Sequence, residues 1–129
     1  ARSYIFTTAA SPITAATLVE AVHVISEADD RRAHLRALIQ QLRTGLASLE
    51  GSRWQMLPSE TAIQPIIIGD NTEALRITDA LLERGLWVPA IRPPTVAKGT
   101  ARLRVSLSAA HTSAHVAALI EALKALACA

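Results

Sequence analysis

Arginine and serine alternate with aliphatic residues at positions 101–108, which read Ala-Arg-Leu-Arg-Val-Ser-Leu-Ser. A period of two predicts a β-strand with two different faces. Arg102, Arg104, Ser106 and Ser108 then share one face, and the aliphatic residues occupy the other. A guanidinium held on a rigid strand presents parallel donors that suit a carboxylate or a phosphate. The pattern also fits a half-solvated antiparallel strand whose arginines bind no ligand.

Two histidines follow this strand. His111 and His115 are four residues apart, a spacing that can place two metal ligands on one helix face. His111 comes before the expected start of the helix, however, and no carboxylate or cysteine stands near the pair in the sequence. We therefore predict no metal site. The sequence also has no nucleophile-elbow motif and no glycine-rich phosphate loop.

Five short stretches together resemble a known family. They are residues 61–65 (Thr-Ala-Ile-Gln-Pro), 69–71 (Gly-Asp-Asn), 92–96 (Arg-Pro-Pro-Thr-Val), 99–104 (Gly-Thr-Ala-Arg-Leu-Arg) and 108–112 (Ser-Ala-Ala-His-Thr). With them the chain resembles the C-terminal domain of the α-oxoamine synthases, which are pyridoxal-phosphate enzymes of the aspartate aminotransferase fold type. The resemblance extends over essentially the whole chain.

The resemblance implies an activity and assigns roles to individual residues. The loop at 92–96 is similar to that of the members that join L-alanine to pimeloyl-CoA or pimeloyl-ACP, with loss of CO₂, in biotin biosynthesis. By this resemblance Arg104 pairs with the amino-acid carboxylate, Thr95 contacts substrate, and Arg92 could meet the distal carboxylate of the acyl chain. Thr7 and Thr8 match the position that reaches across a homodimer to the cofactor phosphate of the partner subunit.

The chain departs from the family in one important respect. The cofactor lysine and its flanking segment are absent, and the sequence opens on Ala1 rather than on methionine. We therefore expect the last third of a longer enzyme, which by itself binds no cofactor and is inactive. Two alternatives remain open: another α-oxoamine synthase resembling glycine C-acetyltransferase, and a non-catalytic interaction module that retains the fold.

The elements that must position these residues can be read from periodicity and caps. Ser11-Pro12 predicts a helix start, and Asp29-Asp30 predicts the start of a second helix, since acidic residues are favourable there. In the first helix Leu18, Val22 and Ile25 mark one face. The apolar stripe of the second helix consists of Leu35, Leu38, Leu42, Leu46 and Leu49.

The second half of the chain predicts alternating strands and helices. Residues 63–68 are apolar and β-branched, which favours a strand, and Pro65 suggests an edge position or an irregular start. Asp70 is expected to cap a helix that ends at Gly85. Strands at 86–90 and 101–108 and a helix from Thr112 complete the order. This order predicts an α+β fold with a small, mostly antiparallel three-stranded sheet and helices packed on one face.

Length and composition set further bounds. A chain of 129 residues suits a single domain, in which residues 1–50 form a helical segment leading to a missing cofactor domain and 51–129 form the α+β core. The net charge is +2 and aromatic residues make up 3%, which argues against a nucleic-acid partner. No apolar run is long enough to span a bilayer, so no membrane partner is expected. A single cysteine, Cys128, fits the reducing cytosol, and we predict a cytoplasmic protein.

Overall fold

The computed structural model describes residues 5, 9, 11–49 and 54–128. The chain divides into two compact units, Ala1–Arg32 and Ala33–Ala129, which we call the helical unit and the α+β unit. Their boundary falls within the first turn of helix α3 (Asp29–Leu46). The domain limits predicted around residue 50 stay a prediction. Thr7 and Thr8 lie outside the described residues.

The helical unit contains helix α2 (Pro12–Ser26). As predicted, Ser11 occupies the N-cap position and a proline opens the first turn. No residue of α2 is buried. Its large apolar side chains are all exposed, namely those of Ile13, Leu18, Val19, Val22, Val24 and Ile25.

Helix α3 carries the predicted apolar stripe into the α+β unit. Leu38, Leu42 and Leu46 are buried, and the stripe continues to the buried Leu49 in the 3₁₀ turn η1 (Ala47–Leu49). At the start of α3, the guanidinium of Arg32 donates two hydrogen bonds to Asp29, at 2.7 and 3.1 Å. The predicted second helix and its buried face are confirmed.

The sheet has four antiparallel strands in the order β1-β2-β4-β3: β1 (Gln55–Met56), β2 (Ile63–Gly69), β3 (Ala90–Ile91) and β4 (Ala101–Ser106). The α+β class is confirmed, with one strand more than the three expected, because two residues before Leu57 pair with β2. The strand expected at 86–90 is shorter than predicted and begins at Ala90. Pro89 accepts a hydrogen bond from the Arg104 N–H, but proline has no N–H with which to extend the ladder.

Pro65 corrects a second expectation. It lies within β2, which is an interior strand flanked by β1 and β4, and not at an edge. Its carbonyl accepts a hydrogen bond from the Leu57 N–H on the β1 side. Because Met56 pairs with Ile66, Leu57 lies opposite Pro65, and proline cannot donate the reciprocal ladder bond to the Leu57 carbonyl. That carbonyl accepts a hydrogen bond from the Arg43 guanidinium instead, at 3.2 Å.

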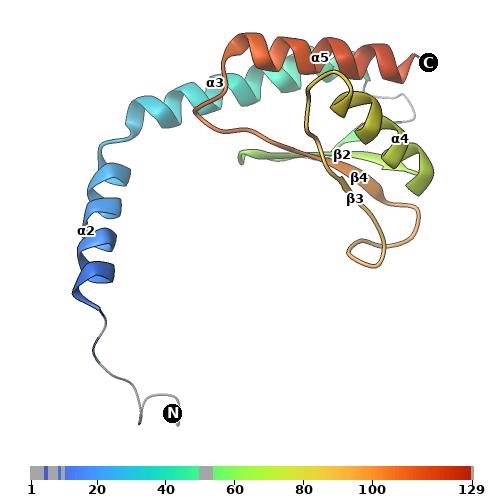
Figure 1. The fold of residues 1–129 in the computed structure, drawn as a ribbon. Coiled ribbons are helices and arrows are strands. Elements are labelled where there is room, and N and C mark those ends of the chain that lie inside the picture. The colour runs from blue at the N-terminus through green and yellow to red at the C-terminus, as the bar shows by residue number, and fades with distance from the viewer. Residues whose placement is uncertain (1–4, 6–8, 10, 50–53, 129) are drawn as a thin grey trace. The chain divides into compact units, whose positions relative to one another are not determined.

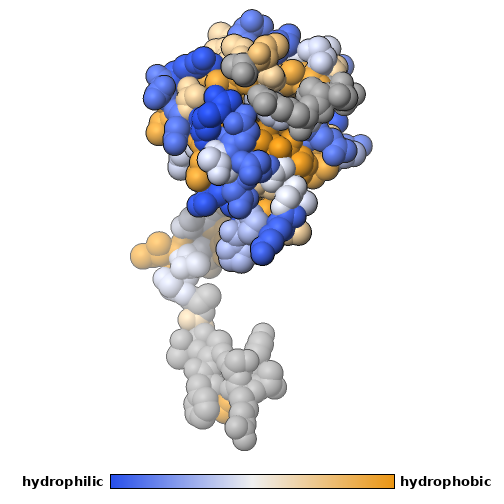
Figure 2. All heavy atoms as spheres, turned by 90° about the vertical axis from the view of Figure 1, so that its right-hand side faces the viewer, coloured by the Kyte–Doolittle hydropathy of each residue, from blue (hydrophilic) through white to orange (hydrophobic). Residues whose placement is uncertain are grey.

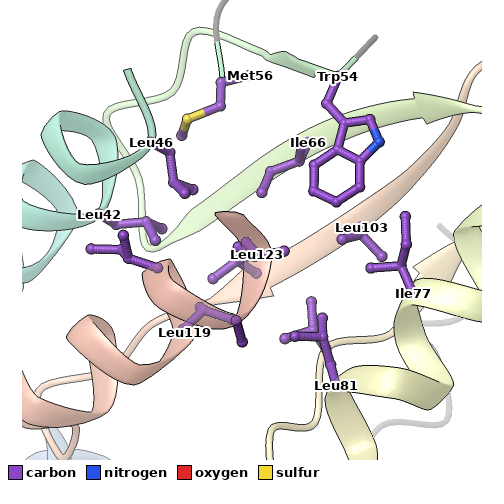
Figure 3. Packing of buried hydrophobic residues seen from close by; sticks show 14 of the residues in the cluster. Leu42, Leu46, Trp54, Met56, Ile66, Ile77, Leu81, Leu103, Leu119 and Leu123 are labelled. Carbon is purple, nitrogen blue, oxygen red and sulfur yellow. The ribbon is translucent and has the colours of Figure 1, made fainter. Parts of the chain in front are cut away.

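One face of the sheet is covered by α3, α4 (Asn71–Leu82) and α5 (Ser113–Ala127), as Figure 1 shows. Figure 3 shows the core between them, where leucines of α3 and α5 meet Ile66 of β2 and Leu103 of β4. Trp54, only 1% exposed, lies in the same cluster. The burial of Leu103, Val105 and Leu107 confirms which side of β4 faces the core.

Caps fix the ends of the last two helices. The Asp70 carboxylate accepts the Glu73 N–H at 2.8 Å, as the sequence predicts, and Gly85 ends the helical region at φ 74°. The Glu73 carboxylate also accepts two hydrogen bonds from the Arg76 guanidinium. These bonds and the negative charge of Glu73 raise the pKa of Arg76. Thr112 caps α5. On the side shown in Figure 2, hydrophilic and hydrophobic residues are interspersed.

Candidate functional site

The predicted arginine face of β4 lies on the side of the sheet opposite the core. Arg104 pairs with Pro65 across the β2–β4 ladder, and Arg102 pairs with Ile67. These residues alternate with buried ones along both strands. No helix of residues 33–49 or 54–128 covers this face (Figure 1). The sheet thus presents two arginines from one rigid element.

The two arginines differ in what their guanidinium groups contact. Arg102 is half-buried and donates to the carbonyl and the hydroxyl of Thr100, at 3.1 and 3.2 Å. The Thr100 hydroxyl in turn donates to the Ala97 carbonyl at 2.8 Å. Arg102 is therefore tied to the turn that precedes its own strand. Arg104 is exposed, and its guanidinium makes no hydrogen bond or ion pair with any residue that the structure describes.

The loop that carries Arg92 and Thr95 joins β3 to β4. Figure 1 shows it leaving the sheet on the side away from α5. Arg92 and Thr95 are both exposed, and one turn brings them together, because the Thr95 N–H donates to the Arg92 carbonyl at 3.0 Å. The loop begins after Ile91, which pairs with Arg102. Arg104 lies two residues, or about 7 Å, farther along the strand.

A buried polar network holds the Thr-Ala-Ile-Gln-Pro stretch that precedes the arginine face. Gln64 is fully buried, and its amide donates to the carbonyls of Ser59 and Thr61, at 3.1 and 2.6 Å. Its oxygen accepts from Arg43 of α3 at 2.9 Å, and Arg43 also donates to the Leu57 carbonyl. This network fixes the entry to β2, and through β2 it fixes the neighbouring β4.

A groove of about 700 Å³ adjoins Arg104. It lies between residues 85–89, β4 and the first turns of α5, and its lining includes Trp87, Ser106, His111 and His115. Sequence reasoning did not identify it. The available signal was Trp87, a large aromatic residue that the structure leaves 81% exposed.

The two histidines are fixed by backbone hydrogen bonds at the β4–α5 turn. His111 Nδ1 accepts the Ser108 N–H at 3.0 Å, and His115 Nδ1 accepts the Thr112 N–H at 3.3 Å. Thr112 and His115 thereby form a reciprocal capping box. The rings of His111 and His115 meet edge-on, with their centroids 6.2 Å apart. Among the described residues no group of three or more His, Cys, Asp or Glu side chains is arranged to hold a metal ion.

Comparison with known proteins gives strong sequence similarity over nearly the whole chain. The chain is 61% identical over 127 residues to an 8-amino-7-oxononanoate synthase from Herminiimonas arsenicoxydans, an alignment that covers 97% of this chain and 32% of that protein. It is 60% identical to an 8-amino-7-oxononanoate synthase from Dechloromonas aromatica, covering 98% and 32%. The chain therefore spans about a third of the length of the curated relatives it matches.

Solved structures share the fold. A serine palmitoyltransferase from Sphingomonas wittichii matches 97% of this chain and 31% of its own, with a TM-score of 0.80 and 30% identity. The 8-amino-7-oxononanoate synthase of Francisella tularensis matches 98% of this chain and 35% of its own, with a TM-score of 0.77 and 24% identity. Among the described residues, no helix is both long enough and apolar enough to cross a membrane.

The family model for aminotransferase class I and II matches residues 1–123. This match covers most of the chain and agrees with the fold-type resemblance inferred from the motifs. The chain belongs to the aminotransferase class I and II family.

Proposed function

We propose that this chain is the C-terminal part of a pyridoxal-phosphate-dependent 8-amino-7-oxononanoate synthase. That enzyme is a C-acyltransferase that condenses L-alanine with a pimeloyl thioester and releases CO₂. The 61% identity to one such synthase supports the activity. The observation that carries the role of this chain is the Arg104 guanidinium, which has no partner among the described residues and stands on a strand face that none of the described helices of the α+β unit covers.

Arg104 suits the carboxylate of the amino-acid substrate. Its two parallel N–H donors bind both carboxylate oxygens and fix the plane of that group. Fixing this plane orients the bonds at the substrate's Cα. Arg102 satisfies part of its hydrogen-bonding capacity on Thr100, so it is less available for this task. The exposed Arg92 and Thr95, in one turn of the adjoining loop, suit contacts with the acyl chain and its distal carboxylate.

The described residues fit only part of a cofactor site. Pyridoxal phosphate, when bound, supplies the electron sink that loss of a proton and of CO₂ requires. It is held covalently by a lysine, and the chain has only Lys98 and Lys124. Lys98 is exposed in the loop, and neither lysine lines the groove beside Arg104. We assign the covalent bond to the remaining two-thirds of the parent protein, and the phosphate contact across a homodimer to Thr7 and Thr8.

A chimera tests the proposal. This chain replaces the matched segment of the Herminiimonas arsenicoxydans synthase, and the product is assayed with alanine and pimeloyl-CoA. We expect formation of 8-amino-7-oxononanoate and growth without biotin of a bacterial strain that lacks the synthase. A chimera that folds but does not form 8-amino-7-oxononanoate would contradict the proposal. Preference for glycine and acetyl-CoA would instead favour the glycine C-acetyltransferase alternative.

The proposal includes the homodimer and the cytoplasmic location that the family resemblance implies. The mass of the chimera in solution tests the first, and fractionation of cells that express it tests the second. A chimera that is active as a monomer would contradict the role proposed for Thr7 and Thr8, because contact with the cofactor phosphate of a partner subunit requires a dimer.

A further inference from the structure

The loop between β3 and β4 begins and ends at one rung of the sheet. Ile91, the last residue of β3, pairs with Arg102 of β4. None of residues 92–100, all of which the structure describes, is buried, so packing against the core contributes little to the conformation of this loop. A loop that is fixed only at its ends has many conformations available. Its shape therefore depends mainly on hydrogen bonds.

Two turns make up this loop. In the first turn, the Thr95 N–H donates to the Arg92 carbonyl at 3.0 Å. In the second turn, the Thr100 N–H donates to the Ala97 carbonyl at 3.2 Å. Only Val96 separates the two turns, so a change in the orientation of the second turn moves the first.

The side chain of Arg102 holds the second turn against the sheet. Its guanidinium donates to the carbonyl and the hydroxyl of Thr100, at 3.1 and 3.2 Å, and the Thr100 hydroxyl donates to the Ala97 carbonyl at 2.8 Å. We call Arg102, Thr100 and Ala97 the loop clasp. The guanidinium is charged, which strengthens its hydrogen bonds, and it belongs to a strand that is paired on both sides. All of these bonds lie within residues 97–102, so they need no part of the parent protein outside this chain.

We propose that Arg102 is a positioning residue for the acyl substrate. This inference rests on the proposed function, in which Arg92 and Thr95 contact the acyl chain and its distal carboxylate. Arg102 does not touch the substrate: it acts through Thr100, which keeps the loop in the orientation that presents Arg92. The two arginines of β4 then serve different substrates, since Arg104 binds the amino acid and Arg102 holds the loop for the thioester. Loss of the clasp weakens use of the thioester and spares use of alanine.

Hydrogen exchange in the 129-residue chain tests the clasp itself. Arg102→Ala removes the guanidinium and Thr100→Val removes only the hydroxyl, so both should speed exchange of the Thr95 amide, read by NMR, by about fivefold or more. Thr100→Ser keeps the hydroxyl and should leave the rate unchanged. Arg36→Ala, which removes an exposed arginine of α3, is the matched control. An unchanged Thr95 rate in Thr100→Val would overturn the proposal even if Arg102→Ala lost its fold.

Kinetics of the chimera test the positioning role. Arg102→Ala and Thr100→Val should each raise KM for pimeloyl-CoA about tenfold or more, while KM for alanine stays within about twofold. Both should also lower the preference for pimeloyl-CoA over heptanoyl-CoA, which lacks the distal carboxylate, because Arg92 is no longer held in place. A merely structural role would reduce the amount of active enzyme without changing this preference. Thr100→Ser should behave as the unmodified chimera does.

The outcomes separate this inference from the proposed function. An unmodified chimera without synthase activity would contradict the proposed function. An active chimera in which Thr100→Val leaves KM for pimeloyl-CoA and the preference over heptanoyl-CoA unchanged would contradict the role of Arg102 alone. An equal rise of KM for both substrates would also overturn that role, because the clasp would then not act on the acyl substrate specifically.

Discussion

At the scale of single residues, the contrast between Arg102 and Arg104 leads to a direct prediction. In the chimera, Arg104→Ala should lower kcat/KM for alanine by about 100-fold or more, because a buried carboxylate would lose its paired cation. Arg104→Lys should retain part of that activity, since a lysine keeps the charge but not the two parallel donors. Steady-state kinetics with varied alanine measure both effects.

Arg102→Ala is the matched comparison, since it removes a guanidinium from the same strand. It should affect kcat/KM far less, because its donors are already bound to Thr100. The assignment of the carboxylate to Arg104 is wrong if Arg102→Ala loses alanine use and Arg104→Ala keeps it.

Gln64 gives a second prediction at this scale. Gln64→Leu should lower the free energy of unfolding by about 2–3 kcal/mol, because the Arg43 guanidinium and the Ser59 and Thr61 carbonyls would lose a buried partner. Urea denaturation of the 129-residue chain measures this change. Gln55→Leu is the control: Gln55 is exposed on β1, and its replacement should change stability by less than about 0.5 kcal/mol. If the two substitutions lowered the free energy of unfolding equally, the hydrogen bonds of Gln64 would not be what stabilises the fold at this position.

At the scale of elements, the sequence predicted those features that depend on interactions between residues close together in the chain. The Asp70 cap, the Gly85 stop and the alternation along β4 all formed as predicted. Pairing between strands was not predictable in the same way. Pro65 is tolerated in an interior strand because the Leu57 carbonyl opposite it accepts a hydrogen bond from Arg43 instead. This compensation comes from α3 and cannot be read from the sequence of β2.

The candidate site shows the same division. The arginine face followed from a period of two. The structure adds the difference between Arg102 and Arg104, because only Arg102 donates to the carbonyl and the hydroxyl of Thr100. The groove escaped prediction because it forms where residues 85–89, β4 and α5 meet. Segments that are far apart in the sequence form this groove, so no periodic pattern within any one of them predicts it.

The packing of α3 against α5 provides a prediction at the element scale. A Cβ added to Gly45 would lie 2.5 Å from Cδ1 and 3.0 Å from Cγ1 of Ile120. Gly45→Ala should therefore destabilise the chain by about 1 kcal/mol, because overpacking outweighs the gain of about 1 kcal/mol in helix propensity. Thermal or urea unfolding measures the difference.

Shortening the opposing side chain should weaken this effect. In Ile120→Val the contact with Cδ1 is absent, while those with Cγ1 at 3.0 Å and Cγ2 at 3.1 Å remain, so the added Gly45→Ala change should cost less than in the unmodified chain. If Gly45→Ala costs the same in both backgrounds, the close approach to Ile120 is not its cause.

At the scale of the whole molecule, the two units should differ in local stability. Helix α2 has 15 residues and none of them is buried, and a helix of that length without tertiary packing is marginal in water. Amides of residues 16–26 should therefore exchange hydrogen within seconds to minutes, while those of β2 and α5 exchange only on global unfolding. Hydrogen exchange read by mass spectrometry tests this. Slow exchange throughout α2 would show that its apolar residues have a partner in solution.

The division of chemistry between this chain and the rest of its parent gives the last prediction. Incubation of the 129-residue chain with pyridoxal phosphate, followed by borohydride reduction, should leave less than stoichiometric label, spread over Lys98 and Lys124. Both are ordinary surface amines in position, one in the β3–β4 loop and one in the last turn of α5, and neither lines the groove beside Arg104. Peptide mass analysis locates the label. The chimera serves as the positive control and should carry one label per chain, at a lysine outside the transplanted segment. Stoichiometric labelling of Lys98 or Lys124 in the isolated chain, accompanied by turnover of alanine and pimeloyl-CoA, would show that this chain is a complete enzyme.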